Sequence, residues 1–506
     1  MEIIGFLYHI VVILENHIDF VLEGMVEKMA DGIKHNIERK AVEVAITGAL
    51  NHIDKKREAG MIDFINLMEK TLGDTWPPRA YEALRQVYEN PDSKWCKFTN
   101  DLFDNVDHGI IKSLALNMGY EAAFRGYKQT RKETKELGEP IPFVLLIDPT
   151  SACNLRCTGC WAAEYGHEMR LSNEDLESIV SQAEDLGIHF FLFTGGEPLM
   201  RKKDLVALAE KHQHSFFQTF TNGTLIDEQY CEDLLRIKNL LPIISLEGFE
   251  EANDSRRGKG TFEKVMHAMD LLKEHKIPFA LSICYTSVNY KVVTSDEFLD
   301  MVIDKGAKSI WYFHSMPVGN DASTDLLLNP DQREYMFHRV REIRGFEGGK
   351  PIFALDFQND GEWVGGCVAG GREYCHINPN GDVEPCVFVH YSSANIHDKS
   401  LLECFKQPIF MKYMEGQPFN DNHLRPCPLL ENPEILPQIV KETGAKSTDL
   451  QSPEDVNSLC GKCDPYAEEW KPRAEKLWQQ ELKDKAAMAA KRDAEMAAKK
   501  QKKASA

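Results

Sequence analysis

Three cysteines lie four and three residues apart in the stretch Cys153-Asn154-Leu155-Arg156-Cys157-Thr158-Gly159-Cys160, and the apolar run Phe143-Val144-Leu145-Leu146-Ile147 precedes them. The run predicts a buried strand, with the cysteines in the loop that follows it. Thiolates are the ligands that iron-sulfur clusters select, and three of them can hold three corners of a cubane cluster while one iron stays open. An open iron can bind and reduce a small molecule. The cysteines alone leave two alternatives, a zinc site and three buried free thiols.

The sequence around this stretch alternates between strands and helices. From about residue 141, short apolar runs are separated by stretches of helical periodicity, which is typical of a parallel sheet built from βα units. The expected strands are Phe143–Ile147, Phe190–Phe193, Phe216–Phe220, Ile243–Leu246, Phe279–Ile283 and Ile310–Phe313. The predicted fold is therefore α/β, a partial (β/α)6 TIM-like barrel that binds its ligand at the carboxyl ends of the strands.

The regions that flank the barrel have a different composition. Residues 1–140 are predicted to form a helical N-terminal domain, 141–350 the partial barrel, 351–470 a Cys-rich auxiliary-cluster domain, and 471–506 a charged helical or disordered tail. The segment 351–470 has little regular apolar periodicity, so a bound metal or cluster is expected to supply the stability that its core lacks.

Polar motifs follow the second, third and fourth expected strands. The first is Thr194-Gly195-Gly196-Glu197-Pro198, whose glycines let the backbone approach a ligand with free amides and whose carboxylate can pair with an ammonium group. Thr221-Asn222-Gly223-Thr224 and Ser245-Leu246-Glu247-Gly248 follow the next two strands. Ordinary turn and capping roles are the alternative for each motif.

A second group of cysteines lies in the C-terminal part. Cys367 and Cys386 flank the step Asn380-Gly381, which predicts a hairpin that brings the two cysteines close together. The further candidate ligands are Cys427, Cys460 and Cys463, enough for one auxiliary cluster. A zinc knuckle without a redox role is the alternative. The cysteines expected to be structural or core thiols are Cys96, Cys231, Cys284, Cys375 and Cys404.

These motifs together resemble the radical S-adenosylmethionine (SAM) superfamily with a SPASM-like C-terminal extension. The resemblance implies that Cys153, Cys157 and Cys160 hold a [4Fe-4S] cluster whose open iron binds SAM. It also implies an auxiliary iron-sulfur cluster on the second cysteine group, and cofactor contacts from Gly195, Gly196, Glu197, Pro198, Asn222, Ser245 and Glu247. Two positions depart from the family pattern, because Gly159 stands where an aromatic residue is usual and Glu247 where Asp is usual.

The composition restricts the partners and the compartment. A net charge of -20 over 506 residues argues against a nucleic-acid binder. Thirteen cysteines in two clusters fit metal ligation in a reducing cytoplasm better than a disulfide framework. The apolar run from Ile3 to Leu14 is too short to cross a bilayer and lacks the basic segment of a secretory signal. Contact of this run with a membrane surface stays open as an alternative.

The predicted function is that of a radical SAM oxidoreductase or transferase. Reduction by an external donor such as flavodoxin or ferredoxin splits SAM into methionine and a 5'-deoxyadenosyl radical, which abstracts hydrogen from an unactivated C–H bond. A peptide or protein is the first expectation for the substrate. Lipid tails or another apolar small molecule are the second, because of the apolar N-terminal run and the aromatic strand Ile310–Phe313. A non-catalytic iron-sulfur or zinc-binding scaffold is the alternative from a different class.

Overall fold

The structure is a computed structural model that describes residues 32, 34–72, 78–162, 166–319, 323–346 and 348–504. The chain forms two compact units, residues 1–89 and 90–506. The first unit is helical where it is described, over residues 34–55, α2 (Arg57–Leu72) and α3 (Pro78–Glu89). The apolar run from Ile3 to Leu14 lies outside the described residues. None of the described helices combines the length and the apolar character needed to cross a bilayer.

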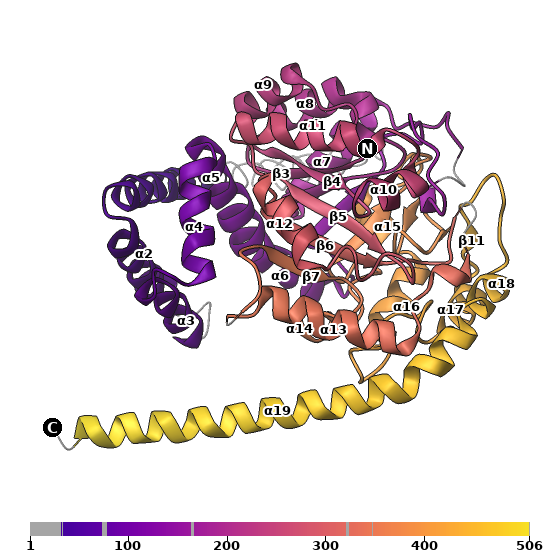
Figure 1. Ribbon diagram of the computed structural model, residues 1–506. Helices are drawn as coiled ribbons and strands as arrows, with labels where there is room; N and C mark the ends of the chain where they lie inside the picture. The colour runs from indigo at the N-terminus through magenta and orange to yellow at the C-terminus, as the bar shows by residue number, and fades with distance from the viewer. Residues whose placement is uncertain are drawn as a thin grey trace, which may run out of the picture. The chain divides into compact units, whose positions relative to one another are not determined.

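The second unit is built on a sheet of nine strands in the order β7-β6-β5-β4-β3-β2-β1-β8-β9 (Figure 1). The strands are β1 (Val144–Ile147), β2 (Phe190–Phe193), β3 (Phe216–Thr221), β4 (Leu240–Ser245), β5 (Ala280–Tyr285), β6 (Ser309–His314), β7 (Phe353–Asp356), β8 (Tyr374–Ile377) and β9 (Val383–Glu384). The six predicted strands are confirmed as β1 to β6, and all pair in parallel with their neighbours.

The C-terminal region adds to the same sheet. β8 pairs in parallel with β1, from Val144 opposite Tyr374 to Ile147 opposite Ile377, and β9 pairs with β8 in the antiparallel sense. The turn at Asn380-Gly381 joins β8 and β9, which confirms the predicted hairpin. β1, the strand that leads into the three-cysteine loop, therefore lies between β2 and β8 rather than at an edge.

Helices follow the strands as in a βα barrel and cover the sheet (Figure 1). They are α7 (Asn173–Asp185), α8 (Lys202–Lys211), α9 (Glu228–Ile237), α10 (Glu250–Arg257), α11 (Thr261–Glu274), α12 (Asp296–Asp304) and α13 (Pro330–Arg344). β1 and β2, near the centre of the sheet, are apolar on both faces because both of their faces are covered. The rings of Phe191 and Phe193, for example, stack on Phe217 at centroid distances of 5.1 and 5.7 Å.

The other elements of the second unit precede and follow this arrangement. Before the sheet come α4 (Lys94–Asn105), α5 (His108–Ser113), a π-helix (Leu114–Gly126) and α6 (Tyr127–Leu137). After it come α14 (Gly361–Val364), β10 (Tyr391–Ser392), α15 (Leu401–Phe405), α16 (Pro408–Gly416), α17 (Ile435–Thr443), β11 (Lys446–Ser447), α18 (Val456–Gly461) and α19 (Asp464–Ala504).

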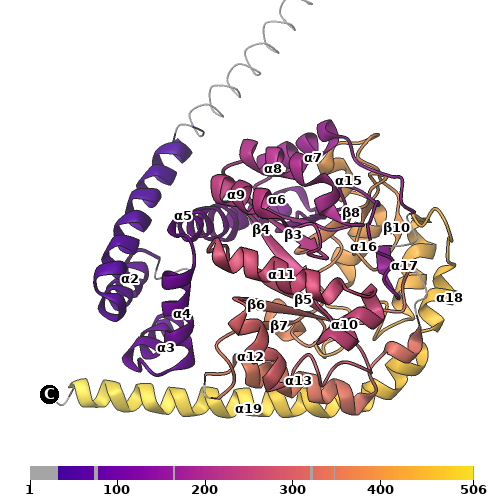
Figure 2. The same cartoon turned by 45° about the horizontal axis from the view of Figure 1, so that its top comes forward.

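A buried arginine ties the C-terminal region to the barrel. Arg333 of α13 is fully buried, and its guanidinium forms an ion pair of 2.6 Å with Glu431, which is also fully buried. The same guanidinium donates to the Tyr466 hydroxyl and lies 4.5 Å from the centre of the Trp470 ring. Figures 1 and 2 both show α19, which carries these two aromatic residues, beside α13. Glu431 also accepts the amide of Cys427 at 2.9 Å, so this pair holds a candidate cluster ligand.

We expect Arg333→Met to lower the free energy of unfolding by about 3–5 kcal/mol, because Glu431 would be left as an uncompensated buried carboxylate. Urea denaturation of the purified protein measures this difference. Arg236→Met is the control, since Arg236 pairs with Glu210 and Asp233 at the exposed surface. Equal small effects of the two substitutions would contradict the assigned role of the buried pair.

Candidate active site

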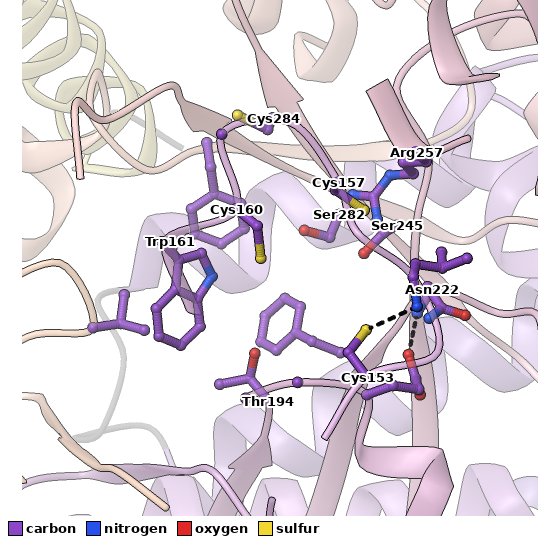
Figure 3. Close-up of a pocket in the computed structure, with 18 of the residues that line it drawn as sticks. Cys153, Cys157, Cys160, Trp161, Thr194, Asn222, Ser245, Arg257, Ser282 and Cys284 are labelled. Atoms are coloured by element: carbon purple, nitrogen blue, oxygen red, sulfur yellow. Dashed lines mark hydrogen bonds between the residues drawn. The ribbon is translucent and has the colours of Figure 1, made fainter. Parts of the chain in front are cut away.

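A pocket lies at the carboxyl ends of the parallel strands. Cys153, Cys157 and Cys160 line it from the loop after β1. Figure 3 shows these cysteines around the pocket together with residues from the ends of β2 to β5. The other lining residues are Leu146, Leu155, Gly159, Trp161, Thr194, Gly195, Gly196, Glu197, Phe220, Thr221, Asn222, Ser245, Arg256, Arg257, Ser282, Cys284, Phe313, His314, Ser315, Met316, Val387 and Phe388.

The two glycines after β2 hold the cysteine loop by direct backbone contact. The amide of Gly196 donates to the Thr150 carbonyl at 2.9 Å, and the amide of Glu197 donates to the Ala152 carbonyl at 2.8 Å. A Cβ atom on Gly195 would lie 2.6 Å from the Thr150 carbonyl, and one on Gly196 would overlap the Ala152 carbonyl. The prediction that glycines occupy these positions to leave amides free for a ligand is therefore wrong for the amides of residues 196 and 197. The glycines let two loops approach each other.

Glu197 is almost fully buried and joins the ends of β2 and β3. One carboxylate oxygen accepts the Thr221 hydroxyl at 2.7 Å and the Leu199 amide at 2.9 Å, while the other accepts the Asn222 amide at 2.7 Å. Burial raises the pKa of Glu197, and these hydrogen bonds oppose that rise. Pairing of Glu197 with a cofactor ammonium group stays a prediction.

Asn222 connects the third strand to the cysteine loop. Its side-chain amide donates to the Asn154 side-chain carbonyl at 2.8 Å, and the Asn154 amide group donates to the Thr224 hydroxyl at 2.8 Å. Asn154 immediately follows Cys153, so the turn after β3 positions the first cysteine.

The C-terminal end of α10 holds the other side of the loop. Arg256 accepts the Thr158 amide through its backbone carbonyl at 3.0 Å and donates from its side chain to the Thr158 carbonyl at 3.2 Å. The buried Glu247 pairs with Arg257 at 2.6 Å and with Arg256 at 3.1 Å. Glu247 contacts the two arginines and does not itself line the pocket. Of the other predicted contacts, Ser245 lines the pocket and Pro198 does not.

Cys284 is a pocket residue that the sequence did not identify. We expected a core thiol, as found for the buried Cys96 and Cys231, but Cys284 lines the pocket beside the Arg256 guanidinium. Burial raises the pKa of Cys284, and Arg256 opposes that rise. The available signal was the alternation of β5, because Cys284 lies two residues after the polar Ser282 and so shares its face.

The three cysteine sulfurs are not gathered as they would be around a single metal ion. Three thiolates around a tetrahedral zinc ion lie roughly 3.8 Å apart, given a Zn–S bond of about 2.3 Å. Among the residues that the structure describes, no three cysteine sulfurs lie within 4.8 Å of one another. Burial, followed by the fields of Glu197, Cys160 and Cys157, raises the pKa of Cys153 to about 11. A cationic group among these thiols would reverse that shift and favour the thiolates.

Tyr413 is buried beside the start of the second cysteine group, where its ring packs against Gly370. Burial, followed by the fields of Cys367, Cys386, Cys427 and Cys460, raises the pKa of Tyr413. Cys463 lies at the junction of α18 and α19, where its amide donates to the Cys460 carbonyl at 2.8 Å. Cys375 and Cys404 lie in the apolar core, which also contains Cys460 and Cys463, so their structural role stays a prediction.

This second group shares a wall with the pocket. Val387 and Phe388, which line the pocket, directly follow Cys386 in the chain. The ring of Phe313, also in the pocket wall, lies 5.2 Å from Phe357, and Phe357 lies 6.3 Å from Tyr374. The Tyr374 hydroxyl donates to the Cys386 sulfur at 2.7 Å. Aromatic rings therefore connect the pocket to the second cysteine group.

Three buried charged groups link β1 to the hairpin. His376 of β8 pairs with Asp148, which follows β1, at 3.0 Å and with Glu384 of β9 at 2.6 Å. All three side chains are fully buried. Burial by itself would lower the pKa of His376, but Asp148 and Glu384 outweigh it and raise that pKa to about 10. The two carboxylates thus favour the imidazolium form of His376, which links the start of the cysteine loop to the hairpin.

Comparison with known proteins identifies two matched segments. Residues 147–303 match the radical SAM superfamily, and residues 367–428 match an iron-sulfur cluster-binding domain, SPASM. The chain is 34% identical to the cysteine-type anaerobic sulfatase-maturating enzyme of Clostridium perfringens over 52% of this chain and 80% of that enzyme. It is 30% identical to the mycofactocin maturase of Mycolicibacterium smegmatis over 53% of this chain and 69% of that protein. It is 28% identical to the Fe-coproporphyrin III synthase of Methanosarcina barkeri, of which it covers 57%, over 44% of its own length.

We expect Gly196→Ala to prevent assembly of an iron-sulfur cluster on the three-cysteine loop, because the added methyl group would displace the carbonyls of Ser151 and Ala152. Iron and sulfide analysis after anaerobic reconstitution measures the loss. Gly119→Ala is the matched control, since the nearest atom to its Cβ, the Leu114 carbonyl oxygen, lies 3.9 Å away. Full iron content in Gly196→Ala would contradict the role in cluster assembly that we assign to this close approach.

The His376 pairs predict a pH-dependent stability. Because the folded-state pKa of about 10 exceeds the ordinary value of 6.5, the stabilisation is complete below about pH 6.5 and is lost as the pH rises through 10. Between pH 7 and pH 10, the free energy of unfolding is expected to fall more steeply in the unsubstituted protein than in His376→Gln. Urea denaturation at each pH tests this. His397→Gln, which changes a half-exposed partner of Asp175, is the control, and parallel curves for His376→Gln would contradict the assignment.

Proposed function

The chain belongs to the radical SAM superfamily, and on this premise we propose that Cys153, Cys157 and Cys160 hold its [4Fe-4S] cluster and that the pocket beside them receives a peptide or protein substrate. The protein is an enzyme whose cofactors are the cluster and SAM, and its SPASM segment binds iron-sulfur clusters. The observation that carries the proposal is the common pocket of the three cysteines and the polar ends of β2 to β5.

When bound, the cluster supplies one electron to SAM, and the cleaved cofactor abstracts hydrogen from the substrate. The protein's part in this reaction is to hold and orient the reactants. We assign SAM contacts to Gly195, Asn222 and Ser245, which line the pocket. Glu197 and Glu247 act as positioning residues: the first orients the turn of Asn222, and the second holds Arg256 and Arg257.

The second cysteine group is the proposed site of an auxiliary cluster. Cys367, Cys386 and Cys427 are its first candidates, and Cys460 and Cys463 can complete the ligand set. Since Val387 and Phe388 belong to the pocket wall, the substrate would lie beside this cluster. Its proposed role is to accept an electron from the substrate radical or to anchor the substrate. The external electron donor is proposed to be a flavodoxin or a ferredoxin.

A peptide or protein substrate is supported by the relatives and by the pocket. Two of the relatives are named as maturases, one of them for a sulfatase, which is itself a protein. The lining combines aromatic side chains with serine hydroxyls and two arginines, so it offers both apolar and polar contacts to a side chain and its backbone.

An apolar small molecule is the second candidate substrate. The apolar part of the lining, which includes Trp161, Phe220, Phe313, Met316 and Phe388, favours it. A relative named for Fe-coproporphyrin III synthesis supports a small-molecule substrate in general, although the chain spans only 57% of that protein. To separate the candidates, 5'-deoxyadenosine formation is measured with small peptides encoded near this gene and with lipid extracts, and mass spectrometry identifies the product.

We expect Cys157→Ala to abolish SAM cleavage by the anaerobically reconstituted protein, because the cluster loses one of its three anchors. Chromatographic detection of 5'-deoxyadenosine is the measurement. Cys231→Ala is the control, since Cys231 is a buried core thiol. If each cysteine group holds one [4Fe-4S] cluster, the unsubstituted chain is expected to bind about eight irons. The double variant Cys367→Ala/Cys386→Ala is then expected to bind about four. Unchanged cleavage in Cys157→Ala would rule out this ligand assignment.

A further inference from the structure

Tyr374 offers a hydrogen bond to a cysteine of the second group. It begins β8, and its buried hydroxyl donates to the Cys386 sulfur at 2.7 Å. The hydroxyl oxygen lies 3.4 Å from the Val387 amide, which donates to it. Because the oxygen already has a donor, the hydroxyl hydrogen is available for the sulfur.

Tyr413 offers a second hydroxyl at the same place. Its side chain, on α16, is fully buried, and its hydroxyl has no hydrogen-bond partner among the residues that the structure describes. The ring is held closely, because a Cβ on Gly370 would overlap it, and Gly370 lies three residues after Cys367. Buried hydroxyls in folded proteins are generally paired. A sulfur acceptor in the second cysteine group would give the Tyr413 hydroxyl a partner.

Sulfur atoms of a cluster are suitable acceptors for both hydroxyls. Reduction adds negative charge to an iron-sulfur cluster, and a donor on one of its sulfurs stabilises the reduced form more than the oxidised form. Hydrogen bonds to sulfur are among the features that set cluster potentials. The sites of the two tyrosines fit this role, because one hydroxyl is paired with a candidate ligand and the other is unpaired on a ring packed against Gly370, three residues after Cys367.

We propose that the hydroxyls of Tyr374 and Tyr413 donate hydrogen bonds to the auxiliary iron-sulfur cluster and hold its reduction potential at a more positive value. This inference rests on the proposed function, which assigns that cluster to Cys367, Cys386 and Cys427. Both tyrosines are positioning residues, because they act on the cluster and not on the substrate. Since Val387 and Phe388 connect Cys386 to the pocket wall, the potential is set beside the substrate.

The test is a potentiometric titration of the full-length chain, reconstituted anaerobically with iron and sulfide and followed by electron paramagnetic resonance. Cys153, Cys157 and Cys160 are all changed to Ala in every sample, so that only the auxiliary cluster contributes a signal. Tyr374→Phe and Tyr413→Phe are each expected to shift the midpoint to a more negative potential. The two changes combined are expected to shift it further.

Tyr312→Phe is the matched control. Tyr312 is also fully buried, and its hydroxyl donates to the Val293 carbonyl at 2.7 Å, so the substitution removes the same atom away from the cysteines. The midpoint potential of the auxiliary cluster in this variant is expected to equal that of the background protein, in which all tyrosines are present.

The outcomes separate this inference from the proposed function. Absence of iron and sulfide from the background protein would contradict the auxiliary ligand assignment. A normal cluster with an unchanged midpoint in both tyrosine variants would overturn the inference alone. If one of the two tyrosine variants loses its iron, the midpoint potential of the other variant decides whether the inference holds. Loss of iron from both would also overturn the inference, because the hydroxyls would then be needed for assembly and not for the potential.

Discussion

The close approach of two backbone segments at Gly195 and Gly196 is the constraint on which the pocket depends. The loop after β2 lies against the carbonyls of residues 150–152, and only residues without a Cβ permit this distance. The loop that carries the cysteines is then held from two further directions, by Asn222 through Asn154 and by Arg256 through Thr158. Neighbouring strands thus position a loop that has no regular structure of its own.

Buried ionisable groups surround this loop, and each has at least one polar or oppositely charged neighbour. Glu197 accepts three hydrogen bonds, Glu247 faces two arginines, and His376 lies between two carboxylates. Removing charges from water is costly unless they are paired and hydrogen-bonded. The carboxyl ends of the strands therefore carry a hydrogen-bonded polar layer at the pocket, whose lining also includes Trp161, Phe220, Phe313 and Phe388. Such a layer fixes the positions of reactants better than mobile surface side chains do.

Much of this arrangement was predictable from the sequence, and the errors have physical reasons. The six central strands were found because strands covered on both faces read as continuous apolar runs. β8 and β9 were not identified as members of the same sheet, since pairing between β1 and β8 joins residues more than 200 positions apart and leaves no local pattern. The hydrogen bonds of Glu197 to Thr221 and Asn222 were not foreseen, because these partners follow another strand and spacing within one motif does not reveal them. The pairing of Glu197 with a ligand stays a prediction. Cys284 was misplaced because a cysteine in an apolar run was taken for a core thiol, although it shares the strand face of the polar Ser282. The domain boundaries and the ligand roles of the cysteines stay predictions.

The pairing of β8 with β1 makes the catalytic and auxiliary regions inseparable. A polypeptide truncated before residue 374 would expose the N–H and C=O groups along one side of β1 and remove the cationic partner of Asp148. An unprotected strand of this kind invites association with other chains. The C-terminal region therefore cannot be exchanged as an independent module among related scaffolds, and any diversification of its cysteines must preserve the strand that completes the centre of the sheet.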